Sequence, residues 1–380
     1  MAAPTIAALS TYPPTQCGLA TFSAALVGQL AHSTEVGIVR VLDAPVNDDP
    51  GPAVVAEILN GSRSSAAAAV DVLNSYDAVI VQHEYGIYGG PDGEDVLDIL
   101  DAIKVPTIVV LHTVLDAPSP QQRRILEAVI KAASVVVTMT NDGRQRLIER
   151  YGVRPSQVVV IPHGAVDHRR TTRAVRPPGS RPTILTWGLL GPGKGIEWAI
   201  DALPALRDLE PRYLVLGKTH PKVQERHGES YRESLVARAQ ALGVDDLVEI
   251  DAGYLTLPAL SGHVRSADVV LLPYDSPDQV TSGVLIEAVA AGRPVVATGF
   301  PHAVEMLSGG AGLVVARQDP AAIAAALRRA FTEPGLSASM AAAAEAQAPH
   351  LVWSAVADRY REVAETLVAG STHAALVAAS

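Results

Sequence analysis

The sequence has little of what disulfide-stabilised, membrane-spanning and nucleic-acid-binding proteins need. Cys17 is the only cysteine in 380 residues, which excludes a disulfide within the chain and a cysteine-rich metal site. Acidic residues outnumber basic ones by 40 to 30, and a formal charge of −10 argues against a nucleic-acid-binding face. No stretch approaches the ~18 uninterrupted apolar residues of a spanning helix, and the first residues lack the basic region of a signal peptide. We expect a soluble, cytoplasmic protein that binds no nucleic acid.

The chain also lacks an Asp-x-Asp pair anywhere along its length. Paired aspartates of this kind hold a divalent ion on the diphosphate in metal-dependent glycosyltransferases of the GT-A type. Their absence argues against that class of enzyme, and we expect neither a metal nor an organic cofactor.

Apolar residues make up 48% of the chain, enough for a sizeable core, and at roughly 150 residues per domain the length predicts two domains. Short β-branched runs alternate with longer alanine-rich stretches, a pattern typical of βαβ units and doubly wound parallel sheets. The runs that we predict as strands are 5–9, 78–81, 107–111, 134–138, 158–161, 183–187, 212–216, 247–250, 268–272, 294–298 and 311–315.

An arginine- and proline-rich stretch interrupts this alternation after residue 167 and predicts a linker. We therefore predict a Rossmann-like domain over 1–170, a linker over 171–182 and a second Rossmann-like domain over 183–350. The remainder, 351–380, is expected to be helical, and packing back on the N-terminal domain is one arrangement that the sequence allows. Ligands of doubly wound sheets bind at the carboxyl ends of strands, so we expect the site in a cleft across which the two domains face.

The most conspicuous motif is the glycine-rich stretch from Gly188 to Gly195, which follows a predicted strand and opens a helix. Its spacing matches the first part of a P-loop, Gly-x-x-x-x-Gly-Lys, with Lys194 as the lysine. The next residue, Gly195, cannot supply the hydroxyl that a P-loop places on Mg²⁺, so we reject a nucleoside triphosphatase. A glycine-rich turn, a lysine and a helix N-terminus still suit an anionic phosphate. The alternative is a tight turn with a solvated lysine.

A second motif follows the strand 268–272 and leads into a helix over 284–291. We expect Thr281 or Ser282 to cap this helix, and the N–H groups of Ser282 and Gly283 to be free to face a phosphate. Glu287 lies one turn inside the helix, at the reach of a ribose diol. The alternative is that Glu287 is an ordinary solvated carboxylate.

Polar residues also follow the predicted strands of the N-terminal half. Gly18, after the strand 5–9, permits a close backbone approach from the other domain. Three histidines and one glutamate closely follow predicted strands, at the sheet edge that we expect to line the cleft. A single histidine at such a position usually has a structural role. These residues are His83, Glu84, His112 and His163.

Taken together and in order, these motifs resemble retaining family 4 glycosyltransferases of the GT-B fold. The resemblance covers most of the chain and rests on the loop at Gly18, the Ile161–Asp167 segment, Gly188–Glu197 and Ala267–Thr298. The strings Q-H-E-Y-G, G-K-T-H-P and Q-x-T-S-G are similar to those of a bacterial subgroup labelled mannosyltransferases.

The resemblance implies a role for each matched residue. Lys194 corresponds to the lysine that binds the donor diphosphate, and Glu287 to the second glutamate of an E-x₇-E element, which holds the ribose. His112 resembles the strand-end histidine beside the transferred sugar. Gly18, Gly188, Ser282 and Gly283 are expected near the donor phosphates, and His83, Glu84 and His163 near the sugar or acceptor.

Three positions depart from the family pattern. Leu189 replaces the usual arginine five residues before the lysine, and Lys218 is our candidate substitute for that charge. Gln279 stands where the first glutamate of E-x₇-E is expected, so its contact with a sugar hydroxyl would be neutral. His163 replaces an asparagine.

The implied function is metal-independent, retaining transfer of a hexose, of mannose or glucose type, from a nucleoside diphosphate sugar such as GDP-mannose to a hydroxyl acceptor. Lys194, Gln279 and His112 are the expected catalytic residues. Two alternatives stay open: a GT-B phosphorylase that uses inorganic phosphate, and a GT-B protein without activity. Membrane contact would be at most peripheral, through Arg123, Arg124 and Lys131 on one predicted helix.

Overall fold

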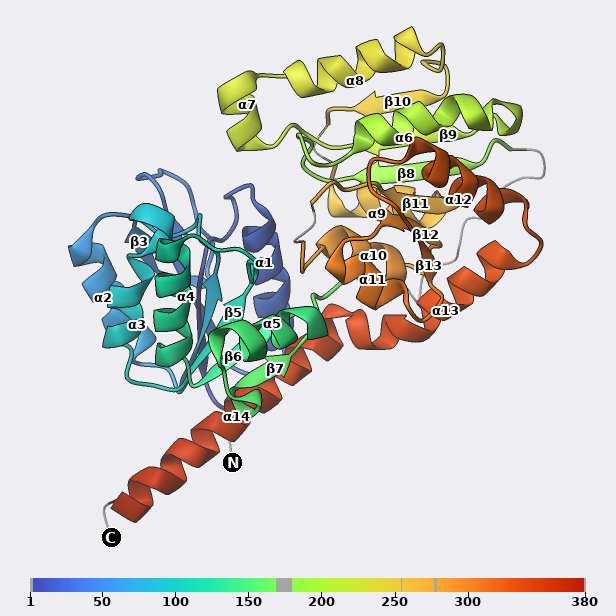
Figure 1. The fold of residues 1–380 in the computed structure, drawn as a ribbon. Helices are drawn as coiled ribbons and strands as arrows, with labels where there is room; N and C mark the ends of the chain where they lie inside the picture. The colour runs from blue at the N-terminus through green and yellow to red at the C-terminus, as the bar shows by residue number, and fades with distance from the viewer. Residues whose placement is uncertain (1–2, 169–179, 254, 277–278, 379–380) are drawn as a thin grey trace. The chain divides into compact units, whose positions relative to one another are not determined.

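The computed structural model describes residues 3–168, 180–253, 255–276 and 279–378 (Figure 1). The chain folds into two compact units: unit 1 comprises Met1–Gly164 and Trp353–Ser380, and unit 2 comprises Ala165–Val352. The chain thus enters unit 2 after Gly164 and returns to unit 1 at Trp353. Most of the linker expected over 171–182 lies outside the described residues.

Unit 1 contains a seven-stranded parallel sheet in the order β3-β2-β1-β4-β5-β6-β7. Its strands are β1 (Ile6–Ser10), β2 (Val36–Leu42), β3 (Val54–Leu59), β4 (Ala78–His83), β5 (Thr107–Leu111), β6 (Val135–Thr138) and β7 (Val158–Val160). The central strands are buried along their whole length, as expected for a parallel sheet covered on both faces.

Helices cover both faces of this sheet. Their bounds are α1 (Gly18–Leu30), α2 (Arg63–Leu73), α3 (Val96–Ala102), α4 (Pro120–Ala132), α5 (Asn141–Tyr151) and α14 (Trp353–Ala378). Apolar residues of α2, α3 and α4 pack on one face, and those of α1 and α14 pack on the other. The C-terminal helix is therefore part of the fold of unit 1.

Unit 2 contains a six-stranded parallel sheet in the order β10-β9-β8-β11-β12-β13. Its strands are β8 (Thr183–Trp187), β9 (Arg212–Leu216), β10 (Val248–Asp251), β11 (Val269–Leu272), β12 (Val295–Thr298) and β13 (Gly312–Val315). Its helices are α6 (Ile196–Ala202), α7 (Pro221–His227), α8 (Ser230–Ala241), α9 (Leu257–Ser266), α10 (Gly283–Ala290), α11 (Pro301–Leu307), α12 (Pro320–Thr332) and α13 (Leu336–Leu351). The prediction of two doubly wound parallel α/β sheets is confirmed.

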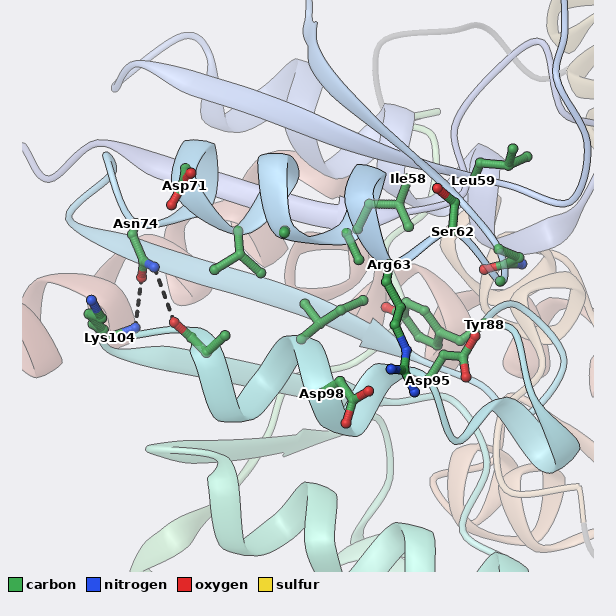
Figure 2. Close-up of a pocket in the computed structure, with 17 residues that line it drawn as sticks. Ile58, Leu59, Ser62, Arg63, Asp71, Asn74, Tyr88, Asp95, Asp98 and Lys104 are labelled. Atoms are coloured by element: carbon green, nitrogen blue, oxygen red, sulfur yellow. Dashed lines mark hydrogen bonds between the residues drawn. The ribbon is translucent and has the colours of Figure 1, made fainter.

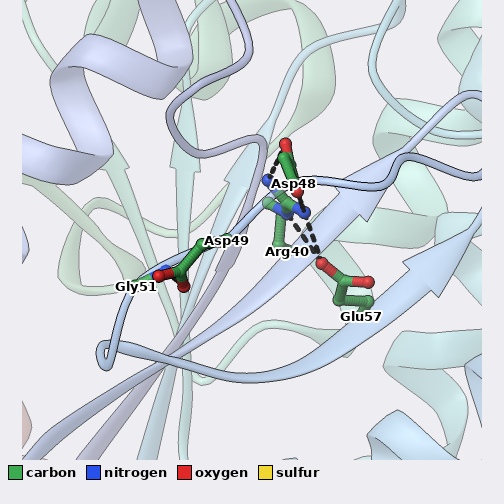
Figure 3. Close-up of polar contacts among 5 residues, drawn as sticks. All are labelled: Arg40, Asp48, Asp49, Gly51 and Glu57. Carbon is green, nitrogen blue, oxygen red and sulfur yellow. Dashed lines mark hydrogen bonds and ion pairs between the residues drawn. The ribbon is translucent and has the colours of Figure 1, made fainter.

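A buried arginine joins β2 and β3 to the segment between them (Figure 3). Arg40 lies in the middle of β2 with its side chain 1% exposed, and its guanidinium contacts Glu57 of β3 (Nε to Oε1, 2.9 Å). The same group contacts Asp48 of the connecting segment (Nη2 to Oδ1, 2.7 Å). Since a buried charge is stable only when it is paired and hydrogen-bonded, these two carboxylates allow a charged residue to lie inside a central strand.

The strand order of each sheet indicates where a ligand would bind in each unit. In each sheet the order reverses between the first strand and the fourth, at β1/β4 in unit 1 and at β8/β11 in unit 2. Ligands of doubly wound sheets bind beyond the carboxyl ends of strands at such switch points. Over the described ranges, no helix is both long and apolar enough to cross a membrane.

Candidate functional site

In unit 2, backbone contacts join the loops that follow β8, β9 and β11. Gly195 has a φ of +64°, and a Cβ atom there would lie 1.8 Å from the carbonyl oxygen of Pro273 after β11. Gly217 after β9 approaches Gly188 after β8 in the same way, because its Cβ atom would lie 2.0 Å from the Gly188 oxygen. Glycine is therefore required at 195 and 217 for the three loops to meet at the switch point.

Lys194 lies above an aromatic ring of the neighbouring loop. Its Nζ is 4.3 Å from the centre of the Tyr274 ring, and Tyr274 is 1% exposed. The next residue, Asp275, accepts a hydrogen bond from Trp198 Nε1 (3.0 Å) and donates its own N–H to the Gly193 oxygen (3.0 Å). A cation–π contact of this kind places the ammonium without neutralising it, so its charge stays available to an anion.

The loop after β9 adds further positive charge to this edge. Leu190 donates its N–H to the Lys218 oxygen (2.8 Å) and accepts from the N–H of His220 (2.8 Å), which fixes the loop against the glycine-rich turn. Burial lowers the pKa of His220, and the charges of Lys222 and Lys194 lower it further. Lys194 and Lys222 are therefore close enough to His220 to act on its charge.

The start of α10 differs from the prediction at Ser282. Ser282 caps the helix, because its Oγ accepts from the N–H of Leu285 (3.3 Å). Its own N–H, expected to be free for a phosphate, instead donates to Nδ1 of His302 (2.8 Å). Ser282 is buried, so a free N–H there would be costly, and His302 satisfies it. Gly283 is the first helical residue.

The second turn of α10 presents Glu287 to the segment that enters unit 2. Its carboxylate accepts from the N–H of Val166 (3.3 Å to Oε2), and His168 Nε2 lies 3.9 Å from the same oxygen. The Glu287 side chain keeps 26% of its surface exposed. Gln279 is half-buried, and its Nε2 donates to the Thr281 oxygen (3.2 Å).

In unit 1, the strand-end residues also gather at the switch point. His83 ends β4 and His112 directly follows β5, and the His112 N–H donates to the His83 oxygen (3.1 Å). Nε2 of His112 lies 2.6 Å from Oε1 of Gln82. Glu84 accepts hydrogen bonds from Thr113 Oγ1 and from the N–H of Tyr85.

Aromatic rings enclose two of these histidines. Phe22 of α1 contacts His112 (4.9 Å between ring centres), His163 (5.0 Å) and Trp353 of α14 (4.9 Å). His163 Nδ1 lies 2.6 Å from the Gly164 oxygen. Three residues that are distant in the sequence therefore meet around Phe22.

Burial keeps two of the histidines neutral. It lowers the pKa of His83 to about 4, and together with the nearby His163 and His83 it lowers that of His112 to about 3. A neutral imidazole is a hydrogen-bond donor at one nitrogen and an acceptor at the other. Near pH 7 these side chains therefore carry no charge for a phosphate, and His112, which is half-buried, can orient a hydroxyl-bearing ligand.

Gly18 is the first residue of α1, after Cys17, whose Sγ accepts from the N–H of Ala20 (3.3 Å). A Cβ atom on Gly18 would meet no described atom within 4 Å. Nothing within the described parts of the protein therefore demands glycine at this position.

A cavity of about 760 Å³ lies elsewhere in unit 1, between α2 and α3 (Figure 2). Ile58, Val70 and Ile99 contribute apolar surface to it, while Arg63 and Asp98 line it with charge. None of the site residues predicted from the sequence lines this cavity. The described part of the chain brings no three metal-ligating side chains together.

The sequence did not identify several residues that support the site. Gln82 contacts His112, Tyr274 lies below Lys194, and His302 holds Ser282. For Gln82 a signal was present: alternation along β4 and β5 places Gln82 and His112 on the same face of neighbouring strands. Tyr274 and His302 depend on tertiary contacts that no local pattern encodes.

Two family models match the chain in succession. Residues 48–169 match the model described as Glycosyltransferase Family 4, and residues 181–333 match the model described as Glycosyl transferases group 1.

Curated relatives carry one recurring name. The D-inositol 3-phosphate glycosyltransferase of Kineococcus radiotolerans is 31% identical over 69% of this chain and 66% of its own length. The protein of the same name from Corynebacterium jeikeium is 30% identical over 70% of this chain and 68% of its own length. The chain spans less than two thirds of the length of the first relatives. It covers 66% of the Kineococcus protein and 59% of the protein of the same name from Acidothermus cellulolyticus.

Solved structures share the fold over almost the whole chain. A glycosyltransferase from Rickettsia africae superposes with a TM-score of 0.75 at 16% identity, covering 96% of this chain and 99% of the other. Anabaena HepE, crystallised with UDP, superposes with a TM-score of 0.73 at 18% identity, covering 96% of this chain and all of the other (100%).

Proposed function

The chain belongs to glycosyltransferase family 4 and has its GT-B fold, and from this premise we propose that it transfers a hexose from a nucleoside diphosphate sugar to a hydroxyl acceptor. The observation that carries the proposal is the junction of the loops after β8, β9 and β11. It sets Lys194 over Tyr274 and holds the Lys218 loop against the glycine-rich turn. A diphosphate suits the lysines of these loops, at the position where doubly wound sheets bind nucleotides.

In this proposal the residues of unit 2 bind the donor. Lys194 and Lys218 stabilise the charge that develops on the leaving diphosphate, the function that a divalent metal serves in other transferases. Each well-placed group of this kind contributes about 10²–10³ in rate. Glu287 binds the ribose through its carboxylate, and Gln279 contacts a sugar hydroxyl.

The backbone positions near the phosphates are Gly188, Gly283 and Gly18. Gly18 is included because its loop resembles the family loop that lies near the donor phosphates. Ser282 contributes by capping α10, since its N–H is occupied by His302.

The residues of unit 1 serve the sugar and the acceptor. His112, His83 and His163 are suited to this work because burial keeps the first two neutral, and Glu84 adds an acceptor group. A neutral imidazole orients hydroxyl groups and does not attract a second phosphate.

We propose that the transfer retains the configuration at the anomeric carbon and needs no metal. The bond between the anomeric carbon and the diphosphate oxygen breaks, and the acceptor oxygen bonds to that carbon on the same face. The acceptor proton passes to the leaving diphosphate oxygen, so no protein carboxylate has to accept it. The name of the relatives makes inositol phosphates reasonable acceptors to test, and the HepE complex adds UDP sugars to the GDP-mannose expected as donor.

The test is an incubation with GDP-, UDP-, ADP- and dTDP-hexoses in chelator-treated buffer, with sugars and inositol phosphates as acceptors. Release of the diphosphate, with NMR of the product anomer, measures both transfer and stereochemistry. Acceptor-dependent release with an unchanged anomer supports the proposal. Formation of a sugar phosphate from inorganic phosphate would indicate a phosphorylase, and no turnover of any donor would indicate an inactive protein.

A further inference from the structure

A buried glutamine determines how His112 is oriented and which of its ring nitrogens carries the proton. Gln82 is the penultimate residue of β4, and its side chain is 0% exposed. His112 follows β5, the neighbouring strand, and lies on the same face of the sheet. The two side chains meet with Nε2 of His112 2.6 Å from Oε1 of Gln82.

This contact allows one tautomer of a neutral imidazole. With the Gln82 amide oriented as in this structure, its carbonyl oxygen can only accept, so Nε2 of His112 carries the proton and Nδ1 is an acceptor. The ring cannot easily turn over, because Phe22 packs against it at 4.9 Å with an interplanar angle of 83°. Nδ1 forms no hydrogen bond with another described group, so it is the atom left for a ligand.

Gln82 also lowers the stability of the fold. Its Nε2 is buried and has no hydrogen-bond partner among the described residues. An unsatisfied buried donor destabilises a fold, so the glutamine lowers the stability of the sheet through this atom. A group retained at such a cost is expected to serve a site.

The groups around His112 favour its neutral form. Burial disfavours its charged form first; from β4 it also faces His83, and after β7 it faces His163, either of which, when protonated, opposes a positive charge on His112. The α1 side presents Phe22, and the buried Ser23 of that helix is already paired with Ser10 (2.7 Å). Glu84, the acidic residue that follows β4, is hydrogen-bonded to Thr113.

We propose that Gln82 is a positioning residue that fixes His112 with its proton on Nε2, so that Nδ1 accepts a hydrogen bond from one hydroxyl of the transferred sugar. The sugar part of this inference rests on the proposed function, and the tautomer does not. A donor at Nδ1 would instead favour a different hydroxyl geometry or the anionic phosphate.

The first test needs no activity. Nitrogen NMR of ¹⁵N-histidine-labelled protein should show His112 with a protonated Nε2 and an unprotonated Nδ1. Gln82→Leu should abolish that preference, and Gln82→Glu should raise the pKa of His112, because a carboxylate stabilises the imidazolium. Ser23→Ala is the matched control: it removes a buried hydrogen bond on the same face and should leave the His112 signals unchanged. A proton on Nδ1 in the wild type would overturn the proposal.

The second test uses transfer kinetics. In Gln82→Glu, the raised pKa of His112 makes Nδ1 a donor in a larger fraction of the protein as the pH falls. kcat/KM should therefore fall on acidification, by up to about tenfold, the value of about one hydrogen bond. The wild type and Ser23→Ala should show no such fall. If the wild type transfers sugar and the Gln82 variants match it in tautomer and pH profile, this inference is wrong and the proposed function stands. If the wild type transfers no sugar while Gln82 controls the tautomer, the proposed function and the sugar contact are wrong.

Discussion

The Cα atom of Gly195 faces the carbonyl oxygen of Pro273 so closely that a Cβ atom on residue 195 would lie 1.8 Å from that oxygen. Gly193, two residues earlier, also has a positive φ (+88°), but a Cβ atom there would meet no described atom within 4 Å. The two glycines flank Lys194. Substitution of each in turn therefore distinguishes the effect of backbone strain, which is common to both, from the effect of the loop contact, which occurs only at Gly195.

Gly195→Ala should therefore do more damage than Gly193→Ala. Each variant places a non-glycine residue at positive φ, at a cost of about 1–3 kcal/mol. Only Gly195→Ala must also displace the Pro273 loop, and with it Tyr274 below Lys194. Thermal unfolding with and without nucleoside diphosphate should show nucleotide stabilisation lost in Gly195→Ala and kept in Gly193→Ala. Equal behaviour of the two variants would contradict the role assigned to the contact.

The hydrogen bond from Ser282 to His302 should contribute measurably to the stability of unit 2. His302→Leu leaves the buried Ser282 N–H without an acceptor and should cost about 1–3 kcal/mol. His302→Asn should restore part of that loss, because its Oδ1 can replace Nδ1 as acceptor. Denaturant unfolding measures all three proteins, and a stability of His302→Leu equal to that of the wild type would show that this bond contributes nothing.

The sequence was sufficient to predict the fold class because parallel strands buried on both faces are continuous apolar runs. All six strands of unit 2 and five of the seven in unit 1 lie at the predicted places. The two that were not predicted, β2 and β3, carry Arg40 and Glu57 at paired positions. A charged residue inside a strand interrupts the apolar run from which the strands were predicted. Only the folded protein shows that Arg40 and Glu57 form an ion pair.

For the candidate site, the sequence predicted which sheet edges carry the site residues. It did not predict which other side chains those residues contact. Strand ends and glycine spacing are local, so Lys194, His83 and His112 could be placed at the carboxyl ends of their strands. The partners of these residues come from remote segments. The prediction of a free N–H at Ser282 was wrong because its acceptor, His302, lies 20 residues away on another helix.

The stability of unit 1 should fall as the pH is lowered from neutrality, in part through His83. Burial lowers its pKa from 6.5 to about 4, so between these values the unfolded chain binds a proton that the folded chain does not. Stability therefore decreases as the pH falls through this range, by about 2 kcal/mol at pH 5 for His83. Guanidinium unfolding at pH 7 and pH 5 should show a smaller difference in His83→Gln than in the wild type. The exposed His32→Gln is the control and should match the wild type; an unchanged difference in His83→Gln would contradict the prediction.

The contact between Arg40 and Asp48 should give a second, more acidic dependence. The Arg40 guanidinium holds the pKa of Asp48 below its ordinary value of 3.8, chiefly through their hydrogen bonds. The stabilisation is complete above the unfolded pKa and is lost as the pH falls through the lower, folded pKa.

Asp48→Asn should consequently lower the melting temperature at pH 7, and the difference from the wild type should shrink below about pH 4. Asp49→Asn is the matched control, because Asp49 is adjacent but accepts only from the N–H of Gly51 (2.9 Å). If the two variants lower the melting temperature equally, the buried arginine does not anchor this segment.

The most direct test of the central claim measures binding of a nucleoside diphosphate to unit 2 through Lys194. Melting temperatures would be recorded in chelator-treated buffer with GDP, UDP, ADP, dTDP or inorganic phosphate, for the wild type, Lys194→Ala and Lys131→Ala, whose lysine lies on α4 of unit 1. At a hundredfold excess over Kd a ligand adds about 2.7 kcal/mol of stability. We predict such a rise with at least one diphosphate, lost in Lys194→Ala and kept in Lys131→Ala. No rise with any diphosphate, or an undiminished rise in Lys194→Ala, would contradict the account.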